Sequence, residues 1–433
     1  MIDTVMFKKY VQRKLESYII RYFKKHPEVK LVVVAGSVGK TSTKVAIATV
    51  LSQKYRVQLY EGNHNTHLSA PLAMLGIEYP ENIKSLGAWL SVFRAARKRI
   101  ADPTGVDVIV QELGVDKPGD MAQFARYLQA DIGVVTSVAP EHMAYFETMD
   151  AVAREELSVA GFSKLVIINR DDIDGQYASY LTNPSLATYG TSGLAEYRFE
   201  GRDFSLADGH AGSFIAPEFF DERVEATIRV VGEHNVRPAV AAATVGVKLG
   251  LTPKEIMAGL SAIRPVNGRM NVLRGAENTT IIDDTYNSSP SAAASALQTL
   301  YQLPSPQRIA VLGSMNELGT SSASEHEVIG KLCDPSLLSW VVTVGKEAED
   351  HLAPAARANG CQVKSFLSAI QAGAFVRSVM EPGAIILAKG SQNSIFVEEA
   401  VKVLLHSTSD EAQLVRQSAQ WNEAKRSFFS QFS

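Results

Sequence analysis

The sequence predicts an α/β fold with two consecutive domains, and two features of the chain support this prediction. Short β-rich runs alternate with helical stretches along most of its length, which is typical of mostly parallel sheets with helices on both faces. Near residue 36, a buried apolar run enters a glycine turn that continues into a helix, as phosphate-binding loops do. We therefore expect a phosphate-loop (P-loop) ATPase domain with a mostly parallel sheet, joined to a smaller Rossmann-like α/β domain.

The composition of the 433 residues is that of an ordinary globular protein, with 46% hydrophobic and 21% charged residues. The longest apolar runs are far shorter than the roughly 20 residues of a membrane span. Two cysteines, Cys333 and Cys361, are too few for a disulfide framework, and a net charge of -3 argues against nucleic acid as a main partner. We expect a cytoplasmic monomer without a membrane span that acts on small molecules.

The first 26 residues are rich in lysine and arginine and carry apolar residues at helical spacing. The apolar positions are Phe7, Val11, Leu15, Tyr18 and Tyr22. Charges interrupt them throughout, so the segment lacks the continuous apolar region of a signal peptide. We predict an amphipathic helix packed on the first sheet, with a helix lying on a membrane surface as the alternative.

The first domain is predicted to span residues 1–265. Its strands are expected at 31–35, 106–110, 130–136 and 164–169, with a helix at 44–51. Residues 195–231 differ, because the alternating runs 199–204 and 224–231 are joined by glycine- and proline-containing turns, which indicates antiparallel strands. An alanine-rich helix over 235–249 follows.

The second domain is predicted to span residues 266–433, after a linker at Arg264–Gly268 whose Arg-Pro-Val-Asn-Gly sequence favours a turn. Its strands are expected at 279–283, 308–312, 340–344 and 384–388. Helical stretches separate these runs, so they indicate a second α/β unit. The polar tail ends in a predicted helix at 421–429.

The sharpest motif follows the first predicted strand and reads Gly36-Ser37-Val38-Gly39-Lys40-Thr41-Ser42. Gly36 and Gly39 allow backbone N–H groups to turn inward around phosphate oxygens, and the next helix presents its positive N-terminal end to the same anion. Lys40 can reach the β- and γ-phosphates of a nucleotide, and the Thr41 hydroxyl can ligate Mg²⁺. Only two residues separate the glycines, where the common phosphate loop has four. A glycine-rich turn with a chance Lys-Thr is the alternative.

Two further residues are expected at the same sheet edge as this loop. Glu112 ends the buried run 108–112, and His142 follows the strand at 130–136. Ligands of open α/β sheets gather at the carboxyl ends of the strands, and a carboxylate there suits Mg²⁺. We predict that Glu112 and His142 are metal ligands, with a surface histidine as the alternative for His142.

Together these motifs resemble the Mur ligase superfamily of ATP-dependent amide-forming ligases. The short phosphate loop is similar to that family's variant, Glu112 to its Mg²⁺ glutamate, and His142 to its second-metal histidine. Gly232-Glu233-His234-Asn235 resembles the family's Gly-x-His-Asn motif, and Gly268-Arg269-Met270 resembles the start of its C-terminal domain. The resemblance implies that Asn235 contacts the nucleotide, that Arg269 reaches the ATP phosphates, and that ATP and Mg²⁺ are used.

Within the superfamily the chain most resembles the branch that adds D-alanyl-D-alanine to a UDP-linked muramyl tripeptide. The resemblance rests on Asp283-Asp284-Thr285-Tyr286-Asn287 and on Met315-Asn316-Glu317-Leu318-Gly319, with His326 at a similar distance. It implies that Asp284 holds the ATP ribose. The residues it places on the substrate side are Asn63, Asn65, Asn287, Asn316, Glu317, His326 and Lys389. For His326, an ordinary position on a surface helix is the alternative.

The chain departs from the family in three places. Only 35 residues precede Gly36, where members that act on UDP-linked precursors carry a UDP-binding domain; folylpolyglutamate synthases also lack that domain. Glu156 stands where the family has a lysine that CO₂ carboxylates. We predict that Glu156 replaces this lysine as a ligand of a second Mg²⁺, with a surface glutamate as the alternative. Gln392 stands where the family often has an arginine that helps to bind the acceptor.

The predicted residues suit acyl-phosphate chemistry, in which a substrate carboxylate attacks the γ-phosphate of ATP and an amine then displaces phosphate. Lys40 and Mg²⁺ would neutralise the developing charge, with Thr41 and Glu112 on one ion and His142 and Glu156 on the other. The substrates are expected to be small peptides or amino acids. Three alternatives stay open: a folylpolyglutamate-type or other amino-acid ligase, a P-loop ATPase subunit without ligase activity, and a ligase that relies on a partner chain to hold its substrate.

Overall fold

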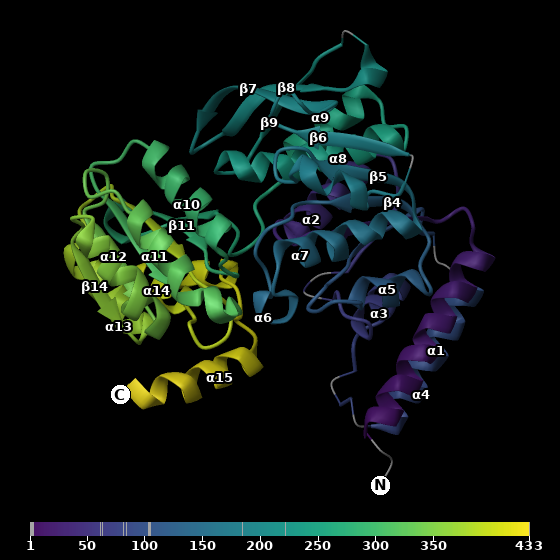
Figure 1. Ribbon diagram of the computed structural model, residues 1–433, viewed down its shortest axis with the longest axis horizontal. Helices are drawn as coiled ribbons and strands as arrows, with labels where there is room; N and C mark the ends of the chain where they lie inside the picture. The colour runs from purple at the N-terminus through teal and green to yellow at the C-terminus, as the bar shows by residue number, and fades with distance from the viewer. Residues whose placement is uncertain are drawn as a thin grey trace. The chain divides into compact units, whose positions relative to one another are not determined.

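The computed structural model describes residues 4–432 except residues 61, 63, 81, 84, 103, 104, 184 and 221. The chain divides into two compact units. Unit 1 comprises Met1–Ala139, Tyr145–Arg229 and Asn235–Ile263, and unit 2 comprises Pro140–Ala144, Val230–His234 and Arg264–Ser433. Each unit is built from helices around its own sheet (Figure 1), so the predicted fold class is confirmed.

The described strands of unit 1 form one sheet in the order β2-β3-β1-β4-β5-β6-β7-β8-β9. Neighbours from β2 to β7 pair in parallel, whereas β7–β8 and β8–β9 pair antiparallel. Strand β1 is Lys-Leu-Val-Val-Val-Ala and is buried from its second residue onward, as expected of a parallel strand covered on both faces. The strands are β1 (Lys30–Ala35), β2 (Val57–Leu59), β3 (Val108–Glu112), β4 (Ala130–Val135), β5 (Ser163–Asn169), β6 (Leu186–Gly190), β7 (Tyr197–Ser205), β8 (Gly209–Ile215) and β9 (Val224–Ile228).

The sequence located most of these strands, and the antiparallel excursion is confirmed as β7, β8 and β9. The strand predicted at 106–110 runs instead from Val108 to Glu112, and Asp107, directly before it, pairs its carboxylate with the side chain of Arg56. Strands β2, β6 and β8 were not expected. Strand β2 has three residues, and β8 begins Gly-His-Ala-Gly-Ser, a composition of low β-propensity.

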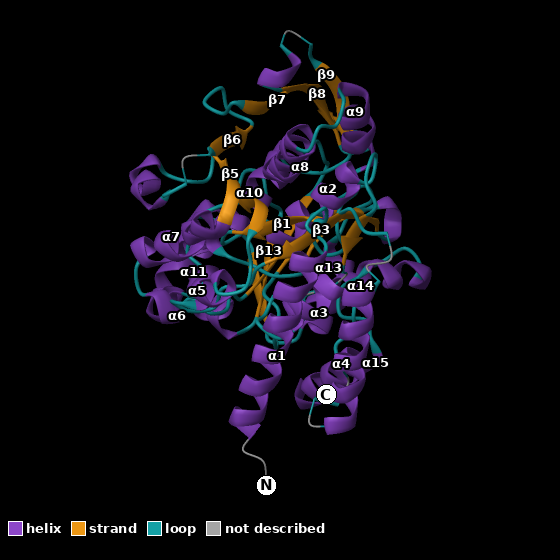
Figure 2. Cartoon of the chain, turned by 90° about the vertical axis from the view of Figure 1, so that its right-hand side faces the viewer, coloured by secondary structure: helices purple, strands orange, loops and turns teal. Residues whose placement is uncertain are grey.

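Helices cover the sheet of unit 1 (Figure 2). Helix α2 begins at Lys40, within the phosphate-loop motif and four residues earlier than predicted, and packs against α8 and α9. A Cβ on Gly246 of α8 would lie 3.2 Å from Val50 of α2, so small residues permit the close approach of these two helices. The helices are α1 (Thr4–Lys25), α2 (Lys40–Leu51), α3 (Ser69–Leu75), α4 (Leu86–Ala101), α5 (Asp120–Ala125), α7 (Met149–Leu157), α8 (Val236–Lys248) and α9 (Pro253–Ala262); α6 (Met143–Phe146) crosses a boundary between the units.

The N-terminal segment is helix α1, and its apolar side is buried as predicted. Val11, Leu15, Tyr18 and Tyr22 are at most 1% exposed. The helix packs against α4 and α3, so the predicted amphipathic helix is confirmed, and its packing on the sheet stays a prediction. Within the described residues, no helix has the length and apolar character needed to cross a membrane.

Unit 2 contains a second sheet, whose described strands lie in the order β10-β11-β15-β12-β13-β14. Only the β10–β11 pair is antiparallel among these strands. Ile281, Ile309, Val311, Val342 and Ile386 form a core with helices α13 and α14. The strands are β10 (Asn271–Arg274), β11 (Thr280–Asp284), β12 (Arg308–Gly313), β13 (Trp340–Val344), β14 (Val363–Phe366) and β15 (Ile385–Lys389). The helices are α10 (Pro290–Gln302), α11 (Ser322–Leu332), α12 (Ala353–Ala358), α13 (Ala369–Val379), α14 (Glu398–Leu404) and α15 (Ala419–Phe429).

The four strands predicted for the second α/β unit lie within one residue of β11, β12, β13 and β15. The short strands β10 and β14 were not predicted, because each has four residues and no continuous apolar run. The parallel order places β15 between β11 and β12. The loops that follow these three strands therefore meet at one edge of the sheet.

Candidate active site

The phosphate loop of unit 1 requires glycine at both predicted positions. Gly36 has a φ of 119°, and a Cβ there would lie 2.3 Å from the Thr136 hydroxyl and 2.8 Å from the backbone nitrogen of Ser137. Gly39 has a φ of 88° and immediately precedes α2. Both angles lie in the region that side chains disfavour. The loop therefore has the backbone conformation that the motif predicts.

Ser137, which sequence reasoning missed, ties the loop to the end of β4. The Ser37 N–H donates to the Ser137 carbonyl at 3.0 Å, and the Val38 N–H donates to the Ser137 hydroxyl at 2.8 Å. The Ser37 hydroxyl in turn accepts from the Ala139 N–H at 3.1 Å. Its position in the chain could have indicated this role, because Ser137 lies just beyond the carboxyl end of β4, the strand that pairs with β1.

Lys40 is the first residue of α2, and its side chain folds back over the loop. Its Nζ donates to the carbonyl of Gly36 at 2.5 Å and to that of Ser37 at 3.1 Å. The ammonium therefore lies directly above the loop whose N–H groups are predicted to hold phosphate. Thr41 and Ser42 follow in the first turn of the same helix, at its positive end.

Glu112, the last residue of β3, meets three side chains at the same sheet edge. Its Oε2 accepts from the Thr41 hydroxyl at 2.9 Å and lies 3.6 Å from the Lys44 Nζ, while its Oε1 accepts from the Asn65 Nδ2 at 3.2 Å. Only 4% of the Glu112 side chain is exposed. The predicted residues Thr41, Glu112 and Asn65 are thus brought together, and Lys44, one helical turn after Thr41, was missed.

This donor set fits a magnesium ion bound together with phosphates. Mg²⁺ commonly takes one or two protein oxygens and completes its shell with water and substrate phosphates, and Thr41 and Glu112 supply a hydroxyl and a carboxylate oxygen side by side. Among the described residues, no group of three or more His, Cys, Asp or Glu side chains is arranged to hold a metal ion.

Glu156 is buried against the phosphate loop rather than on the surface. It belongs to α7, is 3% exposed, and its Oε2 accepts the Gly36 N–H at 2.7 Å. The alternative of a surface glutamate is therefore wrong. Its contact with Gly36 gives Glu156 a part in shaping the loop, and its proposed place as a ligand of a second Mg²⁺ stays a prediction.

His142 belongs to the short segment of unit 2 that follows β4 in the chain. Its Nδ1 lies 3.1 Å from the Glu317 carboxylate, and its Nε2 lies 3.7 Å from Glu141. His142 and Glu317 both have a positive φ, 50° and 66°, a conformation that often marks functional positions. The hydrogen bond from His142 lowers the pKa of Glu317. Its role as a metal ligand stays a prediction.

The carboxyl ends of β11 and β15 carry a buried ion pair. Asp284 and Lys389 face each other in register, with Nζ 2.6 Å from Oδ2 and both side chains at most 8% exposed. The same Nζ donates to the Asn287 carbonyl at 3.1 Å, and Asp284 Oδ1 accepts from the Met270 N–H at 3.3 Å. Burial lowers the pKa of Lys389. Asp284, Asn287 and Lys389, predicted separately, therefore form one cluster.

The loops after β12 and β15 join this cluster through Asn316. Its backbone N–H donates to the Ser391 hydroxyl at 2.9 Å, and its Nδ2 donates to the carbonyls of Gln392 and Asn393 at 2.7 and 3.1 Å. The Gln392 N–H donates to the Asn287 side chain at 3.4 Å. Asn316 thus holds the loop that contains Gln392. The Asn63 prediction lies outside the described residues.

His326 is buried completely, so the alternative of a surface residue is wrong. Its Nε2 accepts the Met315 N–H at 2.9 Å, and its Nδ1 lies 2.7 Å from the Ser322 carbonyl. Nδ1 must therefore carry the proton of a neutral ring. Burial lowers the pKa of His326, which agrees with this assignment. His326 acts on the loop before Asn316 through backbone atoms.

The resemblance assigns Asn235 and Arg269 to the nucleotide as well as Asp284, and these two residues lie in different units. Asn235 precedes α8 in unit 1. Arg269, in unit 2, stacks its guanidinium on the Tyr286 ring at 4.3 Å, and its Nε is buried without a hydrogen-bond partner among the described residues. A buried guanidinium N–H without a partner is unfavourable, so Arg269 has capacity for an anion.

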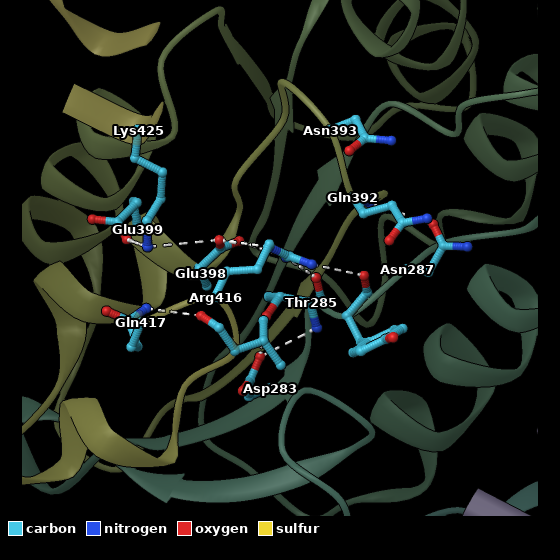
Figure 3. Close-up of polar contacts among 12 residues, drawn as sticks. Asp283, Thr285, Asn287, Gln392, Asn393, Glu398, Glu399, Arg416, Gln417 and Lys425 are labelled. Atoms are coloured by element: carbon cyan, nitrogen blue, oxygen red, sulfur yellow. Dashed lines mark hydrogen bonds and ion pairs between the residues drawn. The ribbon is translucent and has the colours of Figure 1, made fainter. Parts of the chain in front are cut away.

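An arginine from the C-terminal segment, also missed from the sequence, clamps the loop after β11 (Figure 3). Arg416 donates to the carbonyls of Thr285 at 2.6 Å and Tyr286 at 3.0 Å. Its other N–H groups form a two-point pair with Glu398, at 2.8 and 2.7 Å. Lys425 of α15 lies 3.9 Å from Glu398 and 2.5 Å from Glu399. The network fixes the backbone on which Tyr286 and Asn287 stand.

Asp283 lies next to this network and is fully buried. Its Oδ1 accepts from the Thr285 hydroxyl at 2.6 Å (Figure 3), while its Oδ2 has no partner among the described residues. Burial raises the pKa of Asp283 to about 7, and the charges of Asp284 and Glu398 act in the same direction. Asp283 is therefore largely protonated below neutral pH.

Comparison with known proteins gives the same order of domains. Residues 34–246 match the model of the Mur ligase middle domain, and residues 268–392 match that of the Mur ligase, glutamate ligase domain. The UDP-N-acetylmuramoyl-tripeptide–D-alanyl-D-alanine ligase of Bacillus subtilis is 28% identical over 401 residues, which cover 87% of this chain and 76% of that enzyme.

Solved structures share the fold. MurF from Acinetobacter baumannii superposes with a TM-score of 0.75 at 22% identity, covering 91% of this chain and 80% of that one. MurF from Thermotoga maritima, in complex with ADP, gives a TM-score of 0.71 at 22% identity over 90% of this chain and 83% of that one. At these identities the likeness establishes the fold.

Proposed function

This chain belongs to the Mur ligase family, and we propose that it is an ATP-dependent ligase that joins D-alanyl-D-alanine, or a closely similar amine, to the carboxylate of a peptidoglycan precursor through an acyl phosphate. The observation that supports this best is the phosphate loop. It combines two glycines in the required conformation, an ammonium folded over the loop, and a hydroxyl–carboxylate pair at its rim.

We assign the triphosphate of ATP to the loop Gly36–Ser42 at the start of α2. Backbone N–H groups and the helix N-terminus favour the anion, and Lys40 only has to turn from the Gly36 and Ser37 carbonyls toward it. As the substrate carboxylate attacks the γ-phosphorus, negative charge grows on the transferring group, and Lys40 neutralises part of it. Lys40 therefore stabilises the transition state more than the bound substrate.

Thr41 and Glu112 would hold Mg²⁺, which supplies positive charge to the phosphates when bound. Lys44 and Asn65 orient the Glu112 carboxylate from its other sides. Glu156 supports the loop through the Gly36 N–H. These residues thus set the position of the loop and its rim before ATP arrives.

In unit 2 we assign the cluster of Asp284, Asn287, Asn316 and Lys389 to nucleotide and acceptor binding, with Arg269 for a phosphate. Asn287 and Asn316 present amide groups in loops that three strand ends hold together. The amine arrives as an ammonium ion, and the Glu317 carboxylate, whose pKa His142 lowers, can hold it. The ammonium loses one proton to solvent before it attacks the acyl phosphate, and a second proton leaves to solvent or to the released phosphate as the amide forms. A monomeric state and a substrate-holding partner chain stay predictions.

The test is ADP release by the full chain with different substrate pairs. We expect release that requires both UDP-N-acetylmuramoyl-tripeptide and D-alanyl-D-alanine, with a matching amide product by mass spectrometry. ADP release that requires a folate and glutamate would instead favour the alternative, a folylpolyglutamate-type or other amino-acid ligase. Release that no amine stimulates would instead favour an ATPase subunit and would overturn the proposed ligation.

A further inference from the structure

Helices α1 and α4 of unit 1 carry a charge pattern that the proposed reaction does not use. Helix α1 contains seven lysines and arginines and α4 contains four, whereas the only acidic residue on either helix is Glu16. Glu16 is 6% exposed and accepts a hydrogen bond from Gln12. The exposed charge of both helices is therefore entirely positive, in a chain whose net charge is -3.

The two helices run parallel, side by side. At their C-terminal ends, the His26 ring lies 2.9 Å from the Ile100 carbonyl and Lys25 donates to the Ala101 carbonyl at 3.1 Å. One turn or more earlier, the rings of Tyr18 and Phe93 pack at 6.0 Å. These pairs place the C-terminal ends together, before β1 and β3 in the chain, and both helices extend away from these strands toward their N-terminal ends (Figure 2).

Exposed apolar side chains gather at those N-terminal ends. Met6 and Tyr10 of α1 are 69% and 56% exposed, and Leu86 and Leu90 of α4 are 53% and 66% exposed. Each pair is spaced by four residues, so its members lie on one face of their helix. The opposite sides of the same helices are buried through Val11 and other apolar residues. The helices thus have a second apolar surface that the unit itself does not cover.

The backbone adds to the positive potential at this end. Both helices lack an acidic residue in the first turn, and their parallel direction points both positive dipole ends the same way. Lys9 and Arg13 stand beside the exposed Met6 and Tyr10, and Arg94 lies one turn beyond Leu90; all three are exposed. Apolar side chains ringed by cations are the pattern of a surface that enters a lipid headgroup layer.

We propose that the N-terminal ends of α1 and α4 form a docking surface for an anionic phospholipid membrane, with Met6, Tyr10, Leu86 and Leu90 in the headgroup layer and the surrounding cations on lipid phosphates. The positive charge selects an anionic surface. The exposed leucines and methionine favour lipid over nucleic acid, because nucleic-acid surfaces use cations with stacking aromatic groups. The proposal goes beyond the ligase reaction and does not rest on it.

The experiment is co-sedimentation of the full chain with phospholipid vesicles. We expect binding to vesicles with about one-third phosphatidylglycerol, little binding to pure phosphatidylcholine, and loss of most binding at about 0.5 M NaCl, where charges are screened within a few ångströms. Equal binding to both vesicles, or none to the anionic ones at low salt, would overturn the proposal.

Two variants separate the electrostatic contribution to vesicle binding from the apolar contribution. Lys9→Glu with Arg13→Glu and Arg94→Glu should weaken binding to anionic vesicles about 100-fold or more, since each cation near an anionic membrane contributes about fivefold. Leu86→Gln with Leu90→Gln should weaken it about tenfold or more through lost apolar contact. Circular dichroism and ADP release in solution should stay unchanged in both, because all these side chains are exposed.

The matched control reverses three exposed cations elsewhere, Arg229→Glu with Lys254→Glu and Lys364→Glu. It should sediment as the unaltered chain does. If the control variant loses vesicle binding as strongly as the helix variant, the net charge of the protein determines binding, and the proposed docking surface on α1 and α4 is wrong. If single-stranded RNA displaces the vesicles and the leucine variant binds both as before, the surface is a nucleic-acid site and the membrane proposal fails.

Discussion

The two units build their candidate sites in opposite ways. In unit 1, one contiguous stretch, Gly36–Ser42, presents the N-terminus of α2, and the N–H groups of Gly36 and Val38 are held by the neighbouring Glu156 and Ser137 side chains. In unit 2, side chains from three loops meet, and buried charges hold the loops in place. A backbone site needs glycine and a strand–turn–helix path, whereas a side-chain site needs long-range partners that keep its loops together.

Buried ion pairs hold the loops of unit 2, whereas in unit 1 the buried Lys44–Glu112 pair lies at the rim of a loop whose backbone forms the site. The Asp284–Lys389 and Glu398–Arg416 pairs are almost fully enclosed. Enclosing two charges costs solvation that their attraction largely offsets, but removing one partner leaves the other charge buried and uncompensated. Single substitutions test how far each site depends on its buried charges or on its loop backbone. Their expected effects decrease from the first to the last.

Arg416→Ala should produce the largest effect, a loss of about 3–5 kcal/mol in the free energy of unfolding, because Glu398 and two carbonyls lose their donors. Denaturant unfolding of the purified chain measures it. Arg377→Ala is the control, since Arg377 makes one hydrogen bond to a carbonyl in an exposed setting and should cost less than about 1 kcal/mol. Similar losses for both would show that the clamp contributes little to stability.

Lys40→Ala should reduce ADP release about 100-fold to 1,000-fold, since it removes a group that stabilises charge in the transition state. The loop backbone should survive, so circular dichroism and thermal unfolding should match the unaltered chain. Lys254→Ala, an exposed lysine on α9, provides the comparison for a change of charge alone. A Lys40→Ala variant with full turnover would remove the phosphate loop from the reaction.

The pH dependence of stability should reveal Asp283. Its pKa is about 7 in the folded protein against an ordinary value of 3.8, so the folded chain keeps a proton that the unfolded chain loses. The stability from the neutral form is complete below about pH 4 and declines as pH rises to about 7. We expect a decline on the order of 4 kcal/mol, measured by denaturant unfolding.

Asp283→Asn isolates this contribution, because the amide cannot ionise. Near pH 5 the variant and the unaltered chain should differ little, and near pH 8 the variant should be relatively more stable. A constant difference across this range would mean that Asp283 does not titrate there.

Glu156→Gln should have the smallest effect, about fivefold in the KM for ATP, since a charge-assisted hydrogen bond to the Gly36 N–H becomes a neutral one. Glu155→Gln is a matched control on the same helix, where the carboxylate accepts from Gly119 and Met121. A large change in the Mg²⁺ dependence would favour the predicted metal ligand. Unchanged kinetics and Mg²⁺ dependence would exclude both roles.

Sequence reasoning predicted well where a feature is local. The strand, turn and helix around Gly36 follow from contiguous residues, and the edge of the sheet follows for Glu112 from its place at the end of a strand. It succeeded less with His326 and Glu156, for which a surface position was weighed against a role. The burial of the side chain distinguishes a surface position from a role inside the protein. A single sequence indicates burial only through the periodicity of its apolar residues.

What the sequence determined by itself is the α/β class, the phosphate loop and the family, because each depends on short motifs with a fixed local geometry. What only the tertiary structure decided is which distant residues support them. Arg416 reaches Thr285 across 131 positions and Glu156 reaches Gly36 across 120. Such contacts form because buried charges and N–H groups must find partners when the chain packs. No local pattern marks a partner in advance.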